Sequence, residues 1–516
     1  MLDRVLSLNY IMKSRISSHA VFAVALALSV GLPAQSNRGV AGEWGAVIRW
    51  PHVPAHIAQL TDGRMLTWAA ATADDFNISA PNNTISAVFN PSDGSFQNTP
   101  NPRQNMFCAG LSRTIDGKIM AVGGGSATYL TSLFNPSNNT WTASGDTSRR
   151  RWYNTTVTLP SGQIFIALGA GEDQLTELWS PASNIWTPMW NVDFKAILDD
   201  YKLFNSEDYE WYPWLHVAPN GKLFYSGPTT KLYWVDPTGN STANVAPIGP
   251  RIANDRMRIW GNSIMYRPGQ LLITGGRDMN LTPPATNEAM VINLNAAVPV
   301  AQRVAPMNYA RVFHHTLTLP NGEVLAVGGN TSALKFTDDG SILTPEIWNP
   351  AANQWRLVAP MSVARPYHST AALMQDGRVL IIGGGVCGPC GANHPDGQIY
   401  SPPYLFNLSG APASRPSLRS SSVPSQIRVG ANFTVQGSEG VAAFTMIRLQ
   451  ATTHGMQTDH RFLPLTVTGV NRSGAKTEYG LSTNSNPNVF VPGDYWLFAV
   501  NANGTPSTGA VIRVTP

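Results

Sequence analysis

The chain has 516 residues, only 13% of them charged, with 45 Gly and 39 Pro. This composition favours short strands joined by turns, and the length allows one large repeat domain beside a smaller one. The formal net charge of +4 is small and the basic residues form no cluster, so we expect no nucleic-acid partner.

Residues 1–34 are predicted to be a secretory signal peptide. Lys13 and Arg15 precede an apolar run at residues 20–32, and small residues near Pro33 and Ala34 allow cleavage. The run is too short to span a bilayer comfortably. No later run reaches about 18 apolar residues, which is the length typical of a membrane span. We therefore expect a secreted protein, whether extracellular, periplasmic or bound to the cell surface, with no transmembrane segment.

A glycine followed by a strand-like run recurs about every 50 residues, close to the period of a kelch repeat. One such unit cannot bury both faces of its sheet, whereas units arranged radially bury one another. The repeat glycines are Gly63, Gly117, Gly162, Gly221, Gly269, Gly322 and Gly377. We predict an all-β fold with a seven-bladed kelch-type β-propeller over residues 43–405. Residues 43–50 are predicted to close the ring by pairing with the last blade.

A stretch rich in Pro, Ser and Ala at residues 402–416 is typical of a linker. Short runs of alternating apolar residues follow it to the end of the sequence. About a hundred residues of this kind predict a C-terminal immunoglobulin-like β-sandwich over residues 413–516.

The chain has three cysteines, and two of them, Cys387 and Cys390, lie in C-G-P-C. In an oxidising compartment this pair is predicted to form a local disulfide. No second pair completes a zinc site, and no βαβ pattern favours a redox motif. Cys108 is left over and needs a separate explanation.

The ninth residue before each repeat glycine marks the start of the inner part of a blade. These residues should form a ring about the propeller axis: Pro54, Cys108, Tyr153, Tyr212, Trp260, Phe313 and His368. We interpret Gln375 as an extra residue in the seventh blade. Alignment on the preceding arginine instead matches Tyr367 with Tyr153. Two tyrosines, a histidine and a thiol then meet near one mouth of the channel, which suits copper, although aromatic residues at one register can also simply fill a channel.

Four separated motifs carry a resemblance to a known family: NMFCAG at residues 105–110, RWY at 151–153, RPYHS at 365–369 and TTHGMQTDHR at 452–461. Residues 383–405 add a fifth. In these stretches the chain resembles the radical-copper oxidases, the galactose oxidase and glyoxal oxidase family. The N-terminal carbohydrate-binding module of galactose oxidase has no room between the predicted signal peptide and the propeller.

The resemblance implies one copper per chain, held by Tyr153, Tyr367, His368 and His454. Tyr153 would be joined to Cys108 by a thioether and oxidised to a tyrosyl radical, and Tyr367 would act as the base. His460 is the rival of His454 within the same motif. Copper and the Tyr153 radical would each take one electron from the substrate, and O₂ would accept both electrons to give hydrogen peroxide.

The chain departs from galactose oxidase at two positions. The tryptophan that stacks on the thioether there falls at Gly171, with Trp214 and Trp260 as substitutes, and the galactose-binding arginine falls at Ile252. Arg251, Arg256 and Arg258 lie nearby.

We therefore expect a monomeric oxidase of primary alcohols or aldehydes, either small molecules or glycans, without a strong preference for galactose. The alternatives are a non-catalytic surface or adhesion propeller that binds glycan or protein, and a protein that binds metal without turnover.

Overall fold

The computed structural model describes residues 37–76, 82–125, 128–169, 175–202, 212–278, 284–473 and 476–516. Residues Asn37–Pro516 form one compact unit. The predicted signal peptide lies outside the described residues. In the part of the chain that the structure describes, neither α1 (Arg38–Ala41) nor α2 (Lys195–Lys202) has the length and apolar character needed to cross a membrane.

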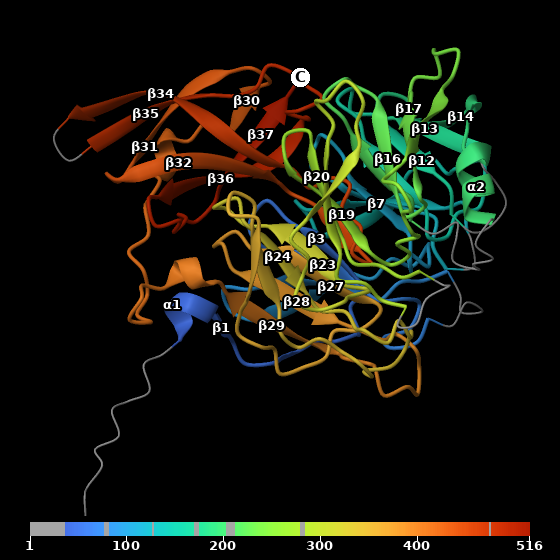
Figure 1. Ribbon diagram of the computed structural model, residues 1–516, viewed down its shortest axis with the longest axis horizontal. Helices are drawn as coiled ribbons and strands as arrows, with labels where there is room; N and C mark the ends of the chain where they lie inside the picture. Colours follow the sequence, from blue (N-terminus) through green and yellow to red (C-terminus); the bar gives the residue numbers. More distant parts are fainter. Residues whose placement is uncertain are drawn as a thin grey trace, which may run out of the picture. The chain divides into compact units, whose positions relative to one another are not determined.

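Six blades each contain four antiparallel strands that follow one another in the sequence, and the first of these blades gains a fifth strand from the C-terminal domain (Figure 1). The first three blades contain β3 (His56–Gln59), β4 (Met65–Trp68), β5 (Ser86–Asn90), β6 (Ser95–Asn98), β7 (Gly110–Arg113), β8 (Ile119–Val122), β9 (Thr131–Asn135), β10 (Thr140–Ala143), β11 (Thr155–Thr158), β12 (Ile164–Ala167), β13 (Leu175–Ser180) and β14 (Ile185–Asp193). The next three contain β15 (Trp214–Val217), β16 (Leu223–Gly227), β17 (Lys231–Val235), β18 (Val245–Pro250), β19 (Asn262–Arg267), β20 (Gln270–Thr274), β21 (Ala289–Asn293), β22 (Ala301–Val304), β23 (His315–Thr318), β24 (Val324–Val327), β25 (Glu346–Asn349) and β26 (Gln354–Leu357).

The seventh blade takes its outer strands from the start of the described chain. Its own strands are β27 (Ser369–Leu373), β28 (Val379–Gly383) and β29 (Asp396–Ser401). Both β1 (Glu43–Trp44) and β2 (Ile48–Arg49) pair with β29, with Glu43 opposite Ser401 and Ile48 opposite Gly397. The predicted closure of the ring is therefore confirmed.

The backbone also confirms the predicted register. The seven repeat glycines have φ between 66° and 90°, a conformation that glycine adopts without steric cost. Six ring positions are left-handed although they are not glycines: Cys108, Tyr153, Tyr212, Trp260, Phe313 and His368, with φ between 48° and 70°. Pro54 occupies the remaining ring position, in blade one, and its pyrrolidine ring excludes the left-handed conformation. Neighbouring ring positions are bonded, since the amide of Tyr153 donates to Cys108 O at 3.0 Å and that of Tyr212 to Tyr153 O at 2.7 Å.

The interpretation of Gln375 as an extra residue was wrong. The turn of blade seven has the same bonds as that of blade six: Gly377 N donates to Met374 O, as Gly322 N donates to Leu319 O. The extra residue lies before the strand instead, where blade seven has one more residue between its buried arginine and the left-handed position than blade six has. Because of this extra residue, both Tyr367 and the ring residue His368 of blade seven can contribute to the site.

The C-terminal domain is a β-sandwich, as predicted. Its strands are β30 (Gln426–Arg428), β31 (Asn432–Gly437), β32 (Val441–Arg448), β34 (Phe462–Ser473), β35 (Lys476–Ser482), β36 (Gly493–Asn501) and β37 (Ala510–Thr515), and short 3₁₀ turns at Pro403–Leu405 and Ser420–Ser422 precede them. The long strand β34 changes partner, because Leu465 pairs with β32 and Thr466 with β35. One apolar cluster takes residues from all seven strands.

The strand β33 (Ala451–Thr453) leaves the sandwich and joins the propeller. It pairs antiparallel with β3, the inner strand of blade one, with Thr453 opposite His56 and Ala451 opposite Ala58. His454 follows directly, so the C-terminal domain delivers this residue to the propeller axis.

Candidate metal centre

The imidazoles of His368 and His454 present the same nitrogen to one point. Nδ1 of His368 lies 2.5 Å from Gly385 O, and because a carbonyl only accepts, Nδ1 carries the proton. The Thr453 hydroxyl donates to Ala55 O and accepts from Nδ1 of His454 at 2.6 Å. Both Nε2 atoms therefore keep their lone pairs. They lie 4.0 and 3.4 Å from Cys108 Sγ, the Nε2 of His454 being the nearer.

The two tyrosines complete the cluster. The hydroxyl oxygens of Tyr153 and Tyr367 are 2.8 Å apart. The ring of His454 lies 5.2 Å from that of Tyr153 and 5.3 Å from that of Tyr367, both edge to face. Cys108, a buried free thiol, packs in one cluster with Tyr153. The structure thus brings together all five residues that the sequence predicted.

Burial favours the neutral forms of both histidines, of Cys108 and of Tyr153. It lowers the pKa of His368 to about 3 and that of His454 well below its usual value, with the neighbouring His368 adding to the second shift. Burial also raises the pKa of the Cys108 thiol and of the Tyr153 phenol well above their usual ranges. Neutral imidazoles are the form that binds metals, and a bound cation would favour ionised phenols.

This donor set fits copper. Two imidazole nitrogens with free lone pairs and two phenol oxygens are the N and O ligands that Cu(II) takes. The hydrogen bonds on both Nδ1 atoms fix the ring orientations, as such bonds do at known metal sites. His368, His454, Tyr153 and Tyr367 would hold the ion, with Cys108 beside it.

His460 does not belong to this cluster. Its Nδ1 lies 2.8 Å from Gln450 Oε1, and Gln450 N donates to Gln59 Oε1 at 2.7 Å. The structure therefore assigns His460 to the contact between the sandwich and blade one and brings His454 to the tyrosines, as the motif resemblance implied.

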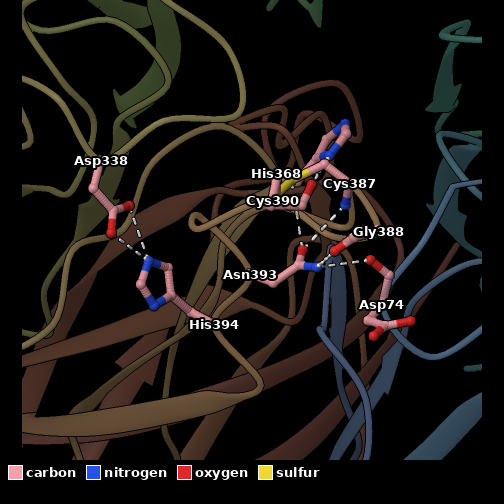
Figure 2. Close-up of a disulfide and its surroundings, with 9 residues drawn as sticks. Asp74, Asp338, His368, Cys387, Gly388, Cys390, Asn393 and His394 are labelled. Carbon is pink, nitrogen blue, oxygen red and sulfur yellow. Dashed lines mark hydrogen bonds and ion pairs between the residues drawn. A yellow bond between two sulfur atoms is a disulfide. The ribbon is translucent and has the colours of Figure 1, made fainter.

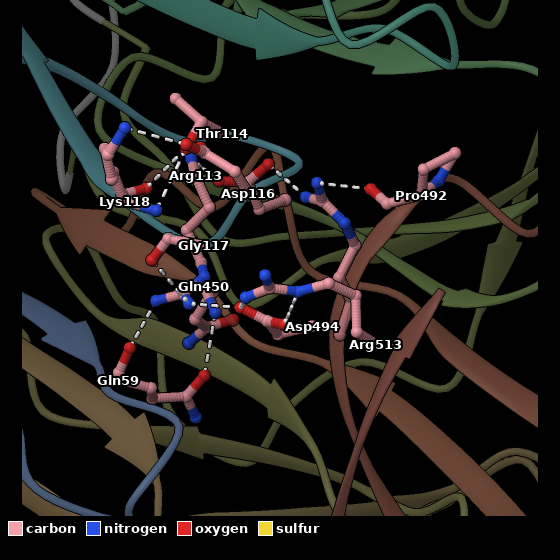
Figure 3. A network of polar contacts seen from close by, with 12 residues as sticks. Gln59, Arg113, Thr114, Asp116, Gly117, Lys118, Gln450, Pro492, Asp494 and Arg513 are labelled. Atoms are coloured by element: carbon pink, nitrogen blue, oxygen red, sulfur yellow. Dashed lines mark hydrogen bonds and ion pairs between the residues drawn. The ribbon is translucent and has the colours of Figure 1, made fainter. Parts of the chain in front are cut away.

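A network of charged side chains holds the segment that carries His454, and Figure 3 shows the part of it around Arg113, Asp494 and Arg513. Arg113 of blade two donates its backbone amide to Asp459 at 2.8 Å and its guanidinium to Asp494 at 3.1 Å. Asp459 also accepts from Arg448, and Asp494 from Arg513 at 2.8 Å. Because one acid lies on the His454 segment and the other on β36, the network ties propeller and sandwich together.

Replacing Asp459 with alanine is expected to destabilise the copper-free protein by about 3–5 kcal/mol, because it leaves the Arg448 guanidinium buried without its carboxylate. Arg472→Ala is the matched control. It breaks a pair with Glu439 whose side chains are 68% and 71% exposed, and it should cost less than about 1 kcal/mol. Denaturant unfolding measures both changes, and equal losses would show that the network is not stabilising.

The predicted disulfide is present (Figure 2), and it begins two residues after Gly385, whose carbonyl bonds His368. Cys387 and Cys390 are linked, with Cα atoms 5.7 Å apart. Asn393 accepts from the Cys387 amide at 3.1 Å and donates to Gly388 O at 2.6 Å. The same loop supplies the Gly385 carbonyl that orients His368, so the disulfide supports a contact of the metal site.

Opening this loop with the double variant Cys387→Ser, Cys390→Ser is expected to lower copper affinity about tenfold, the range seen when a ligand loses its orienting partner. Global stability should change little, because the closed loop is very short. His394→Ala is the control, since it removes only the pair with Asp338, whose atoms lie 2.9 Å apart. Equal copper affinity in wild type and the double variant, by competition with a chelator, would contradict the prediction.

Sequence reasoning missed the aromatic wall around His368. The ring of Phe107 lies 4.9 Å from His368 and that of Phe336 lies 5.6 Å from it, while Phe76 stacks between these two phenylalanines. Phe107 lies within the NMFCAG motif at residues 105–110, but Phe76 and Phe336 lie in loops outside the repeat register. No spacing in the sequence could have indicated them.

A small cavity opens beside Tyr153, Tyr367 and His454. The remaining lining is aromatic or apolar except for the backbone of Gly261: Tyr212, Trp214, Pro228, Ile259, Trp260, Phe313 and Met456. Both tryptophans proposed as substitutes thus line it, and Trp260 packs on Phe313 at 4.5 Å. Among described residues, Trp152 and Tyr212 also pack on Tyr153. Gly171 lies outside the described residues.

Two of the three nearby arginines are structural. Arg251 and Arg258 are buried and share Asp255, at 2.6 and 3.5 Å respectively. Arg258 also bonds Glu288. Arg256 is exposed and lines a different cavity. The described lining of the cavity beside the tyrosines therefore contains no arginine.

Comparisons with known proteins agree with this geometry. Residues 415–514 match the family model "Galactose oxidase-like, Early set domain", and residues 271–387 match "Glyoxal oxidase N-terminus". Galactose oxidase of Gibberella zeae is 33% identical over 491 residues, which is 92% of this chain and 71% of the relative. Aldehyde oxidase GLOX1 of Arabidopsis thaliana is 26% identical over 361 residues, 62% of this chain and 58% of the relative.

A solved structure shares the whole architecture. It is described as a novel fungal alcohol oxidase with catalytic diversity among the AA5 family, in complex with copper. It superposes with a TM-score of 0.84 at 30% identity and covers 92% of this chain and 100% of its own. The chain belongs to the galactose oxidase and glyoxal oxidase family of copper radical oxidases.

Proposed function

We propose that the protein is a secreted copper-radical oxidase that converts primary alcohols or aldehydes to the aldehyde or acid and reduces O₂ to hydrogen peroxide. The observation that supports this most is the meeting of both Nε2 atoms with Cys108 Sγ, next to a pair of tyrosine hydroxyls. A propeller that only binds glycan or protein has no use for this combination. The sequence of residues 1–34 supports secretion.

Tyr367 and Tyr153 would carry out different steps of the oxidation. Oxidation of an alcohol removes two electrons and two protons, and bound copper would accept one electron and acidify the substrate hydroxyl. Tyr367 would take the hydroxyl proton at its Oη. Tyr153, linked to Cys108 and oxidised to a radical, would take the second hydrogen, and its oxygen lies 2.8 Å from that of Tyr367. Base and radical oxygens would thus both be close to one substrate bound beside them.

The cavity supports a small uncharged substrate. Its aromatic and apolar lining favours an apolar or aromatic group next to the reacting hydroxyl or aldehyde. Arg251 and Arg258 are taken up by Asp255, so neither is available to hold a sugar.

Copper-loaded protein is therefore expected to release hydrogen peroxide from small aryl or aliphatic primary alcohols or aldehydes, with kcat/KM for the best of them at least about tenfold above that for galactose, or about 1.4 kcal/mol. A peroxide assay over matched alcohols, aldehydes and sugars measures this. The metal-free protein is the control. A profile dominated by galactose would overturn the substrate assignment, and copper binding without any peroxide would favour a binding protein.

A further inference from the structure

His56 lies behind the cluster on β3 and is fully buried. Its Nε2 accepts the backbone amide of Cys108 at 2.9 Å. Because Nε2 accepts, the proton is on Nδ1, which donates to Trp68 O at 3.2 Å. The ring stacks on Trp68 with centroids 4.9 Å apart and planes within 3°. Hydrogen bonds at both nitrogens and stacking on one face thus fix the orientation of this imidazole.

The backbone of Cys108 is held on both sides. His56 binds its amide, and the amide of Tyr153 donates to its carbonyl at 3.0 Å. Trp68 donates to the carbonyl of Met106, two residues before Cys108, at 3.4 Å. Cys108 itself has φ of 57°, a conformation that residues with a Cβ adopt only when their surroundings impose it. These hydrogen bonds to the backbone of Cys108 determine where its Sγ lies relative to Tyr153.

Other buried histidines of the propeller serve a different purpose. Four of them bond to hydroxyl groups on neighbouring strands: His52 to Thr67, His216 to Ser263, His314 to Thr274 and His315 to Ser369. Their bonds end on hydroxyl groups within strands, whereas the Nε2 bond of His56 ends on the backbone amide of a residue in the cluster.

We infer that His56 is a positioning residue for the formation of the Cys108–Tyr153 thioether, an inference that rests on the proposed function. In that step the S–H bond of Cys108 and a ring C–H bond beside the Tyr153 hydroxyl break, and an S–C bond forms. The two protons and two electrons released reduce O₂ to hydrogen peroxide. His56 exchanges no proton in this step; by holding the Cys108 amide it keeps Sγ at the tyrosine ring.

Two variants test separately the hydrogen bonds made by the two nitrogens of His56. In His56→Gln the amide group reaches the place of Nε2 and can accept from Cys108. In His56→Asn it reaches only the place of Nδ1, so the contact with Trp68 remains and that with Cys108 is lost. His216→Asn is the matched control, because it removes a buried imidazole bond of 2.9 Å to Ser263 instead.

The experiment adds Cu²⁺ and air to reduced, copper-free protein and follows the cross-link over time by peptide mass, with copper content and thermal unfolding measured alongside. His56→Asn is expected to cross-link at least about tenfold more slowly than wild type, as expected for a lost buried hydrogen bond. His56→Gln and His216→Asn should follow wild type, and all should bind copper.

An unchanged rate in His56→Asn, or equal slowing in His56→Gln or His216→Asn, would overturn the inference. So would loss of copper binding in His56→Asn, because His56 would then act on the metal site. Absence of the cross-link in copper-treated wild type would instead sink the proposed radical mechanism.

Discussion

Replacing Cys108 with serine is expected to lower alcohol oxidation about a thousandfold or more, equivalent to about 4 kcal/mol in activation free energy. Sulfur bonded to the ring donates electron density, which lowers the potential at which Tyr153 is oxidised. Without it the second electron acceptor is hard to form. Copper should still bind, because His368, His454 and both tyrosines are untouched. Peroxide assays and copper content of the variant measure the two effects.

The same variant separates two roles of the thiol. Cys108 Sγ lies 3.4 Å from His454 Nε2, close enough for sulfur itself to be a metal ligand after a small adjustment. If copper is lost together with activity, the thiol is a ligand and the radical mechanism fails. Full activity in the variant would also contradict the mechanism. In active wild type, peptide mapping should recover Cys108 and Tyr153 joined.

His454→Ala is expected to weaken copper binding at least about a thousandfold, which corresponds to about 4 kcal/mol of binding free energy. It removes one of two imidazole ligands and leaves a cavity beside Tyr153. The fold should persist, because β33 and the Arg113–Asp459 contact remain. Competition with a chelator measures the affinity, and circular dichroism checks the fold.

His460→Ala is the matched control for this change. It removes a histidine six positions along the same segment, whose contact is with Gln450 at 2.8 Å. Its copper affinity should stay within about tenfold of wild type. Weak binding in His460→Ala together with normal binding in His454→Ala would reverse the assignment of the two histidines.

Regular spacing made part of this site predictable. The repeat glycines set a register that placed Cys108 and Tyr153 on consecutive blades, and the shared left-handed φ at both residues has the same origin. His454 could not come from the register, since it arrives from another domain. Only the resemblance of its motif indicated it. Alignment on the preceding arginine matched Tyr367 with Tyr153, although the extra residue of blade seven was wrongly placed at Gln375.

The remaining parts depend on contacts that spacing does not encode. His56 stands on an ordinary buried strand, and its value to Cys108 follows from the direction of one ring nitrogen. Phe336 reaches His368 from a long loop of blade six whose path the sequence does not specify. The sequence places Arg251 and Arg258 near the substrate-binding position of the family but does not reveal that both pair with Asp255.

The pairing of β33 with the inner edge of blade one also sets an order of events during synthesis. The ribosome makes the strands of all seven blades before His454, so this ligand can join the propeller axis only after they have been made. A nascent or truncated chain would thus carry Cys108 and the tyrosines without a finished metal site.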